Sequence, residues 1–445
     1  MPTSVFDSFV FRGIFGETKI SHIWSDEYRT QQYLNWESAL AKVEASLGLI
    51  PQEAAEEIRR VCEVKNIDFK KLEEETLTIG YPVLGVVHQI SKLCREDAGK
   101  YCHWGATTQD VTDTVTILQI LESFKIIRYF LEQAIELTET LSRKYKDTPM
   151  VGRSNLQQAV PITFGFKMAR LLCTFRRHIQ RLDELVPRLS VVEFGGACGT
   201  LASLGENGLK VQERLAKELG LSPPEIVWHT ERDRIAEAGC FLGLVTGTLG
   251  KFACDVKLMM QNEIREVSEP YIVNRGSSST MPQKRNPISC VYITACVSCV
   301  RQKVAALLDA MVEDHERATG TWEIEWIVLP EIFSLTGKAL EHTVFVLQGL
   351  EVNPERMKTN LSLTKGLISS EAVMMKLASF LGRDEAHDLV YSLCRKANEK
   401  DQSLEEVLLQ EKKVTDHLTE KQVLDLVNPA NYLGQTLAMI DRVLK

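Results

Sequence analysis

Three sequence patterns that identify common enzyme classes are missing from this chain of 445 residues. It contains no phosphate-binding GxxxxGK[ST], no dinucleotide-binding GxGxxG and no zinc-binding HExxH. Gly195, Gly196 and Gly199 do not stand between a predicted strand and a helix, as a dinucleotide site requires. We therefore predict no cofactor and no metal. What remains is acid–base chemistry on an anionic small molecule.

Basic excess, long apolar runs and a leader pattern are also missing. Lys and Arg number 52 against 60 Asp and Glu, a net charge of −8, which argues against a general nucleic-acid binder. No eighteen-residue window is uninterruptedly apolar, so no membrane span is expected. The first ten residues lack a basic stretch followed by an apolar run, so no signal peptide is expected. Eleven cysteines scattered among apolar segments suit reduced thiols in a cytoplasmic protein.

Helical periodicity dominates the sequence that is present, and Ser25 is predicted to cap the start of the helix that follows it. Helical segments are short up to about residue 110, long between 112 and 349, and short again from 353. We predict three helical domains: 1–110, 111–352 and 353–445. No strand-rich region is expected, although residues 191–199 also suit an extended segment. The fold class is therefore all-α.

The five long segments would form rods of roughly 35–55 Å at 1.5 Å per residue. They cover residues 112–145, 161–185, 231–269, 284–314 and 326–349. Several are apolar on nearly all sides and must be buried on most of them. The third carries closely spaced glycines that allow a neighbouring helix to approach: Gly239, Gly243, Gly247 and Gly250. We predict an elongated five-helix bundle that packs against bundles of other chains, rather than one monomeric core.

A polar segment, Gly276–Pro287, separates two of the long helices. Its glycine and two prolines argue against a continuous helix. Its three consecutive serines can donate or accept hydrogen bonds, while Lys284 and Asn286 supply the donors that an anionic substrate needs. A plain surface connector is the alternative. The donor-rich composition favours a functional loop.

Two further polar segments precede predicted helices. In His103–Asp110, Thr107 and Thr108 offer hydroxyl and N–H groups to an anion at a helix start; simple capping is the alternative. Gly152–Pro161 is unusually rich in hydrogen-bond donors; a solvated loop is the alternative.

Two charged patches follow later in the chain. In Trp228–Arg234, Arg232 and Arg234 can grip a carboxylate bidentately; pairing with Asp and Glu on a surface face is the alternative. The stretch Asp314–Trp326 places charged residues beside two tryptophans.

The segment Ser278–Pro287 resembles the signature loop of the fumarase/aspartase superfamily, written GSSxMPxKxNP. The match is long and specific. Thr107–Asp110, Arg153–Pro161 and Arg232–Arg234 resemble that superfamily's other active-site regions, in the same order. The resemblance covers nearly the whole chain, including the C-terminal domain of the adenylosuccinate lyase branch. It implies a three-domain all-α subunit and a homotetramer with a twenty-helix core, in which three subunits build each active site.

The resemblance also implies a mechanism. In that superfamily a serine of the flexible loop removes a proton next to a carboxylate, and the carbanion is stabilised as an aci-carboxylate. Counting back from Met281 places this role on Ser278. Ser277 stands where the signature has its glycine, with Gly276 one place earlier, so Ser277 stays an alternative base. A serine is a poor base unless the loop supplies N–H donors and a cation, for which Lys284 is the natural choice.

The branch is indicated by residues outside the loop. Adenylosuccinate lyases carry catalytic histidines where this chain has Tyr81 and Asn155, whereas His103 matches a histidine of that branch. The polar segments look like those of bacterial-type 3-carboxy-cis,cis-muconate cycloisomerases, which interconvert a tricarboxylate and its lactone: His103–Asp110, Leu156–Pro161, Trp228–Arg234 and His315–Ala318. Gly80–Gly85 resembles the related fungal trans-aconitate decarboxylases at least as well.

We therefore predict a cofactor-independent lyase or cycloisomerase of a small unsaturated tricarboxylate. Three alternatives stay open: a trans-aconitate decarboxylase, a C–N lyase of the adenylosuccinate type, and a non-catalytic crystallin-like relative, against which the intact Ser-Lys-Asn set argues. The catalytic candidates, with the histidines for proton transfer or orientation, are Ser278, His103, Lys284 and His229. The substrate-binding candidates are Thr107, Thr108, Arg153, Ser154, Asn155, Gln157, Arg232, Ser277, Ser279, Met281 and Asn286.

Overall fold

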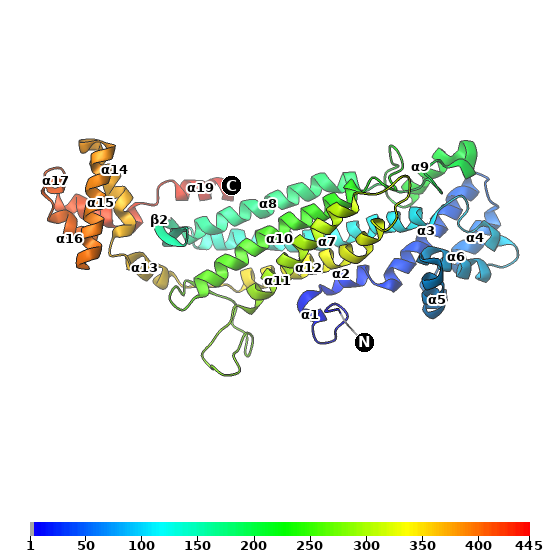
Figure 1. The fold of residues 1–445 in the computed structure, drawn as a ribbon, viewed down its shortest axis with the longest axis horizontal. Helices are drawn as coiled ribbons and strands as arrows, with labels where there is room; N and C mark the ends of the chain where they lie inside the picture. The colour runs from blue at the N-terminus through cyan, green and yellow to red at the C-terminus, as the bar shows by residue number, and fades with distance from the viewer. Residues whose placement is uncertain (1–3) are drawn as a thin grey trace. The chain divides into compact units, whose positions relative to one another are not determined.

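The structure is a computed structural model, and it describes residues 4–445. Over these residues the chain is 68% helical, with 19 α-helices and only short strands (Figure 1). The predicted all-α class is confirmed. The division into three consecutive domains stays a prediction. By contact density the chain divides into two compact units, each made of three separate stretches.

The first unit comprises the chain up to Leu131, His178–Gly250 and Tyr292–Glu341. Its N-terminal helices are short except for the third: α1 (Arg12–Phe15), α2 (Thr18–Ile23), α3 (Asp26–Ser46), α4 (Gln52–Val61), α5 (Phe69–Ile79) and α6 (Pro82–Leu93). Short 3-10 turns follow α4 and α6, at Val64–Asn66 (η1) and Ala98–Tyr101 (η2). The predicted cap is present, because the Ser25 hydroxyl accepts a hydrogen bond from the Tyr28 N–H at 3.2 Å.

The long helices occur where periodicity places them, with shifted ends. They are α7 (Thr108–Lys144), α8 (Phe164–Leu189), α10 (Asp233–Met260), α11 (Ile288–Ala310) and α12 (Trp322–Gln348). The third predicted segment is too long at its C-terminal end, because the chain turns after Met260 and Arg265 adopts a positive φ of 51°. The fourth starts too early. Pro287 precedes α11, whose first N–H groups, at Ser289 and Cys290, donate to the Glu269 carboxylate.

The glycine prediction holds in part. Within the first unit α10 and α11 lie side by side (Figure 1). A Cβ added at Gly239 would collide with the Leu307 side chain, and one at Gly250 would lie 3.0 Å from Val297. Gly243 has room for a Cβ at ordinary contact distance, and Gly247 meets nothing within 4 Å. Two of the four glycines therefore lie where a neighbouring helix approaches closely.

Between α8 and α10 the chain is mostly irregular. Val191 forms an isolated bridge with Ser222, and residues 192–196 belong to no regular element. A 3-10 segment, η3 (Ala202–Asn207), leads into α9 (Gly208–Glu218). The extended character expected for residues 191–199 is therefore limited to one bridge.

The second unit comprises Glu132–Arg177, Lys251–Val291 and His342–Lys445. It contains two small antiparallel pairs: β1 (Pro149–Ser154) with β2 (Gln157–Thr163), and β3 (Val267–Ser268) with β4 (Glu351–Val352). The first pair corrects the prediction that residues 152–160 form a loop and that a helix starts at 161. The turn is made by Asn155 and Leu156, whose φ values of 50° and 64° are positive.

Short helices complete the second unit. They are α13 (Pro354–Ser362), η4 (Leu367–Ser369), α14 (Ser370–Leu381), α15 (Arg383–Lys400), α16 (Leu404–Leu409), α17 (Lys412–Thr415), α18 (Glu420–Val427), η5 (Pro429–Asn431) and α19 (Thr436–Leu444). A core of aliphatic side chains joins α14, α15, α16 and α18, with Leu377, Leu393 and Leu408 among its buried members. Figure 1 shows α14, α15 and α16 together.

Two helices, α10 and α11, are long and apolar enough to span a membrane, by length and composition only. The sequence predicts no span, because no eighteen-residue window is uninterruptedly apolar. The best eighteen-residue windows of α10 and α11 have mean hydropathies of 1.2 and 1.4. The protein itself buries 50% of the α10 window and 28% of the α11 window. Apolar core helices pass the same test, so the observation is weak evidence for a membrane. It does show that α11 exposes apolar surface in this chain.

Candidate active site

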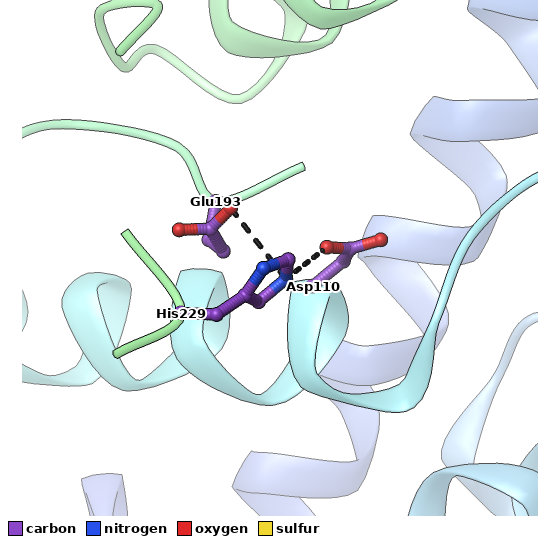
Figure 2. A group of neighbouring side chains, drawn as sticks. All are labelled: Asp110, Glu193 and His229. Carbon is purple, nitrogen blue, oxygen red and sulfur yellow. Dashed lines mark hydrogen bonds and ion pairs between the residues drawn. The ribbon is translucent and has the colours of Figure 1, made fainter. Parts of the chain in front are cut away.

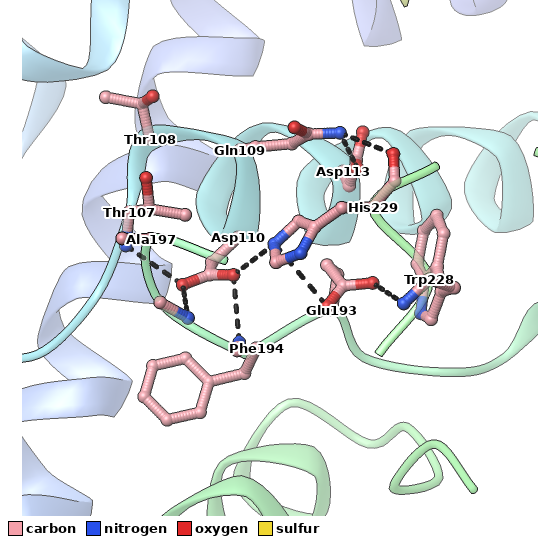
Figure 3. Close-up of polar contacts among 12 residues, drawn as sticks. Thr107, Thr108, Gln109, Asp110, Asp113, Glu193, Phe194, Ala197, Trp228 and His229 are labelled. Carbon is pink, nitrogen blue, oxygen red and sulfur yellow. Dashed lines mark hydrogen bonds and ion pairs between the residues drawn. The ribbon is translucent and has the colours of Figure 1, made fainter. Parts of the chain in front are cut away.

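Asp110, in the first turn of α7, connects three segments of the first unit (Figure 3). Its Oδ1 accepts hydrogen bonds from the Gly195 N–H at 3.0 Å and from Nε2 of His229 at 2.8 Å. Its Oδ2 accepts from the Gly196 N–H at 3.0 Å and the Thr107 N–H at 2.9 Å. Four hydrogen bonds to one buried carboxylate fix the position of the Thr107 loop.

His229 is enclosed beside two carboxyl groups (Figure 2). Its side chain is 3% exposed, and Nε2 lies 3.6 Å from Oε1 of Glu193 as well as against Asp110. Burial opposes the imidazolium, but the Asp110 hydrogen bond and the Glu193 charge outweigh it and raise the pKa of His229. Burial raises the pKa of Glu193 to about 8, although the His229 charge lowers it. Such a buried histidine suits orientation of the loop better than direct contact with a substrate.

One possible ligand atom from each of Asp110, Glu193 and His229 lies within 4.8 Å of the others, close enough to share a metal ion. Hydrogen bonds already occupy most of these atoms, although Oε1 of Glu193 is buried without a hydrogen-bond partner among residues 4–445. Both Asp110 oxygens accept from backbone N–H groups, Nε2 of His229 is bonded to Asp110, and Oε2 of Glu193 accepts from the Trp228 N–H at 2.6 Å. We assign this cluster an organising role.

Arg232 lies between acidic side chains inside the first unit. It is fully buried and forms two bidentate pairs, with Asp113 at 2.7 and 3.0 Å and with Glu325 at 2.6 and 3.0 Å. Burial raises the pKa of Glu325, although Arg232 opposes that shift. Arg232 therefore pairs with Asp and Glu side chains, as the alternative interpretation predicted. The pairs lie in the interior rather than on a surface. The guanidinium has no free face for a substrate carboxylate.

An aromatic cluster adjoins this ion-pair group. Tyr81 stacks on Trp322 with ring centroids 5.9 Å apart, and Trp326 meets both rings edge-on. Nε1 of Trp322 donates to Asp113 at 3.0 Å, and the Tyr81 hydroxyl donates to Glu323 at 3.3 Å. Tyr81, where the sequence departs from adenylosuccinate lyases, and the tryptophans of the Asp314–Trp326 stretch therefore form one cluster.

A small cavity of about 40 Å³ lies beside the aromatic cluster. Both apolar and polar residues line it: Trp24, Arg29, Tyr33, Pro82, Thr112, Thr116, Glu325, Trp326 and Leu329. This volume is far below that of small-molecule pockets, so the cavity alone does not define a substrate site.

Thr107 and Thr108 stand at the start of α7, as predicted, and Figure 3 shows both side chains there. The Thr107 hydroxyl accepts a hydrogen bond from Arg317 at 3.0 Å. Arg317 therefore adds a cation beside Thr107 and Thr108, which are predicted to bind an anion, and we call these three residues the anion-binding corner. Arg317 was not among the predicted site residues, although it belongs to the charged stretch Asp314–Trp326.

His103 lies just before that corner, with a φ of 57°. Its Nδ1 is 2.6 Å from Oε1 of Glu37, and its side chain is 15% exposed. Glu37 is a second residue that sequence reasoning missed. The signal was present, because Glu37 and Glu44 occupy the apolar face of α3 with Tyr33 and Leu40, at spacings of three and four residues.

The signature loop belongs to the second unit, and its base is closed by Gly276 and Asn286. Both the Asn286 N–H and its side-chain amide donate to the Gly276 carbonyl, at 3.0 and 2.9 Å. Gly276 has a φ of 68°, and a Cβ there would lie 2.5 Å from the Asn286 carbonyl oxygen. The displaced glycine of the signature is thus required by the closed base. Asn286 is committed to this contact.

The loop serines differ in their hydrogen bonds. The Ser278 hydroxyl oxygen accepts from the N–H of Met281 at 3.1 Å and of Thr280 at 3.3 Å. The Ser277 hydroxyl donates to the Asn274 carbonyl at 3.0 Å. N–H donors stabilise a serine oxygen as it loses its proton, whereas donation to a carbonyl stabilises the protonated form. These contacts favour Ser278 over Ser277. Ser279, Met281 and Lys284 are exposed.

Arg153, on β1, is also paired within the second unit. Its two terminal nitrogens donate to Glu266 at 2.7 and 2.8 Å, and Glu266 is fully buried. Asn360 donates to the same carboxylate at 2.9 Å. The guanidinium therefore anchors the hairpin, and its substrate contact stays a prediction. The hairpin residues Ser154, Asn155 and Gln157 are exposed at the turn.

The predicted site residues therefore form two groups, one in each unit. The first unit holds His103, Thr107, Thr108, His229 and Arg232. The second holds Arg153, Ser154, Asn155, Gln157, Ser277, Ser278, Ser279, Met281, Lys284 and Asn286.

Comparison with known proteins identifies the class. A family profile described as Lyase matches residues 11–301, and one described as Adenylosuccinate lyase C-terminus matches residues 366–443. The first alone spans more than half of the chain. The chain therefore belongs to the fumarase/aspartase superfamily of lyases, in its adenylosuccinate lyase branch.

Individual relatives refine this picture. The chain is 69% identical to an uncharacterised protein of Schizosaccharomyces pombe, over the full length of both. It is 55% identical to trans-aconitate decarboxylase 1 of Mycosarcoma maydis, over 97% of this chain and 87% of the relative. The crystal structure of 3-carboxy-cis,cis-muconate lactonizing enzyme from Pseudomonas putida matches with a TM-score of 0.92 and 40% identity, over 98% of both chains.

Proposed function

We propose that this protein is a cofactor-independent lyase of a small unsaturated tricarboxylate, with Ser278 as the proton-transferring base. The observation that carries the proposal is the pair of backbone N–H groups directed at the Ser278 oxygen. A serine hydroxyl is normally far too weak an acid to act at neutral pH, and such donors lower that cost. Lys284, exposed on the same loop, supplies the cation that the developing charge needs.

The remaining polar groups are proposed to hold carboxylates. Thr107 and Thr108 offer hydroxyl groups at the N-terminus of a long helix, where anions are stabilised. Arg317 adds a positive charge at Thr107. Binding a polycarboxylate next to these groups would stabilise the extra negative charge that develops on the substrate during the reaction.

The reaction proposed is decarboxylation. The C–C bond to one carboxylate breaks and carbon dioxide leaves. The electron pair left on carbon takes a proton from the Ser278 hydroxyl, and the Ser278 oxygen, acting as a base, then takes a proton from water. The 55% identity to a trans-aconitate decarboxylase supports this choice over cycloisomerisation, for which the support is 40% identity. In the second candidate reaction a carboxylate oxygen adds across the double bond and a proton is added to the neighbouring carbon, so that no carbon dioxide forms.

A homotetramer with shared active sites is part of the proposal. It is supported by the exposed apolar side chains that remain on long helices of the chain, such as Leu244 on α10 and Leu308 on α11, 54% and 48% exposed. Apolar surface of this kind marks an interface in a protein of this type. A cytoplasmic location is also proposed. It is supported by the absence of disulfides among the eleven described cysteines.

The test is a substrate panel with two readouts. Purified protein is incubated with trans-aconitate and with 3-carboxy-cis,cis-muconate, while carbon dioxide release and loss of ultraviolet absorbance are followed. Carbon dioxide from trans-aconitate is expected; lactone formation without carbon dioxide would select the second candidate. Ser278→Ala should lower kcat by at least about a hundredfold, as loss of a catalytic base does, while Ser277→Ala should keep most activity. Full turnover in Ser278→Ala would refute the base assignment.

A further inference from the structure

The segment before α7 contains a histidine whose ring is held by one buried acid. Nδ1 of His103 is 2.6 Å from Oε1 of Glu37, and Glu37 is 1% exposed. The ring also packs near Trp36, with centroids 6.4 Å apart, and Trp36 in turn packs on Phe194. Aromatic walls exclude water from this contact, which strengthens the interaction between the two charges.

Glu37 has no competing partner in the described part of the chain. Its second oxygen, Oε2, is buried and accepts no hydrogen bond there. A buried carboxylate without compensation is costly, so the imidazolium of His103 is what stabilises Glu37 in the interior. The dependence is mutual, because the carboxylate favours a proton on Nδ1 and leaves Nε2 as the nitrogen directed away from the pair.

The backbone reinforces this arrangement. His103 has a φ of 57°, a left-handed conformation that few residues other than glycine adopt, and it lies four residues before Thr107. Thr107 is fixed separately by Asp110 and Arg317. His103 and Thr107 are therefore fixed at the two ends of one short segment, His103 by Glu37 and Thr107 by Asp110 and Arg317.

We propose that Glu37 is a positioning residue that keeps His103 protonated and oriented beside the anion-binding corner. His103 then presents a cationic Nε2–H to a carboxylate, or a proton to a carbanion, at a pH where a free imidazole would be neutral. This inference rests on the proposed function for what His103 acts upon. The Glu37–His103 pair itself does not depend on that function.

Three charged or titratable groups act on His103. Glu37 faces it from α3, Asp110 acts from α7, and Cys102 precedes it in the chain. Burial opposes the charged ring, but the Glu37 charge and hydrogen bond, followed by Asp110 and Cys102, outweigh it and raise the pKa of His103. Glu37 is the largest favourable contribution, so its removal should leave the opposing effect of burial in control.

The chain offers a matched control on the same helix. Glu44 lies seven residues after Glu37, is fully buried, and neither of its oxygens has a hydrogen-bond partner within residues 4–445. Burial, and then the charge of Glu37, raise the pKa of Glu44 to about 9. Glu44 is thus already neutral at pH 7, so Glu44→Gln changes size and charge very little there.

The experiment measures the titration of His103 directly in the full-length protein. Histidine labelled with ¹³C at Cε1 is incorporated, and the His103 resonance is assigned with His103→Asn. In Glu37→Gln its midpoint should fall by at least one pH unit, which lowers the protonated fraction about tenfold at high pH. Glu44→Gln should leave the midpoint unchanged. Glu37→Asp, which keeps the charge at a longer distance, should give an intermediate midpoint and serves if the glutamine variant does not fold.

Turnover provides the second readout. The alkaline limb of kcat/KM should move to lower pH in Glu37→Gln by the same amount as the resonance midpoint. An unchanged His103 midpoint in Glu37→Gln, or an equal shift in Glu44→Gln, overturns the inference. A shifted midpoint in a protein that turns over none of the tricarboxylates supports the Glu37–His103 pair and refutes only the proposed function.

Discussion

The burial of Glu44 predicts how the stability of the protein changes with pH. Its carboxyl group is fully buried on α3 without a hydrogen-bond partner in the described chain, and its pKa is raised from 4.5 to about 9 by burial and by Glu37. Between these two values the unfolded chain releases the proton while the folded protein retains it. Folding stability therefore falls as pH rises from 4.5 towards 9.

The magnitude follows from the size of the shift. Each pH unit in this window costs about 1.4 kcal/mol, so the wild-type protein should lose about 3 kcal/mol between pH 5.5 and 7.5 through this one group. Glu44→Gln has no proton to release and removes that loss. Its amide leaves buried donors unpaired, at a cost of about 1–3 kcal/mol that does not change with pH. The quantity to test is therefore how the difference in unfolding free energy between Glu44→Gln and wild type changes with pH. Its absolute value at one pH is not the test.

The assay is urea unfolding of both proteins at pH 5.5, 6.5 and 7.5. The free energy of unfolding of Glu44→Gln relative to wild type should increase steadily with pH. Glu27→Gln, on the exposed face of the same helix, should differ from wild type by no more than about 0.5 kcal/mol at any pH. A difference between Glu44→Gln and wild type that is constant with pH would refute the reasoning, because it would mean that Glu44 is ionised in the folded protein.

Three further predictions concern other contacts. Arg232→Met removes the cation between two buried carboxylates and should lower the free energy of unfolding by about 3–5 kcal/mol in urea titrations, whereas an unchanged value would argue against the ion pairs. Gly276→Ala places a Cβ against the Asn286 carbonyl and should abolish turnover while urea unfolding stays unchanged; normal turnover would show that the loop base adapts. Arg153→Lys cannot keep the bidentate contact with Glu266 and should raise protease cleavage within the hairpin, and equal cleavage would contradict an anchoring role.

Local signals predicted much of this fold. Apolar periodicity identified the five long helices, and Ser25 marked the start of α3 through the hydrogen bond that its hydroxyl makes. The hairpin β1–β2 was missed, because the residues at and beside its turn, such as Asn155 and Gln157, are polar and are equally typical of a loop. A two-stranded pair of this kind is decided by pairing across the turn, which composition does not reveal.

The site was predictable to a different degree. The loop around Ser278 is contiguous in sequence, so its residues could be recognised together. The choice between Ser277 and Ser278 needed the hydrogen bonds of the folded loop. The ion pairs of Arg232 could not be predicted, because its partners, Asp113 and Glu325, are 119 and 93 residues away. Partners so distant in sequence leave no local trace, and the same is true of Glu37 and His103.

The hydrogen bonds of Asp110 have a consequence for folding. This one carboxylate joins segments that are separated by 85 residues, at Gly195, and by 119 residues, at His229. Contacts of such separation form only after much chain entropy has been lost, so they come late in folding. During synthesis the Asp110 carboxylate therefore cannot complete the hydrogen bonds that fix the Thr107 loop until the chain beyond His229 has emerged from the ribosome. We expect this corner of the molecule to be the last part of the first unit to become protected from hydrogen exchange.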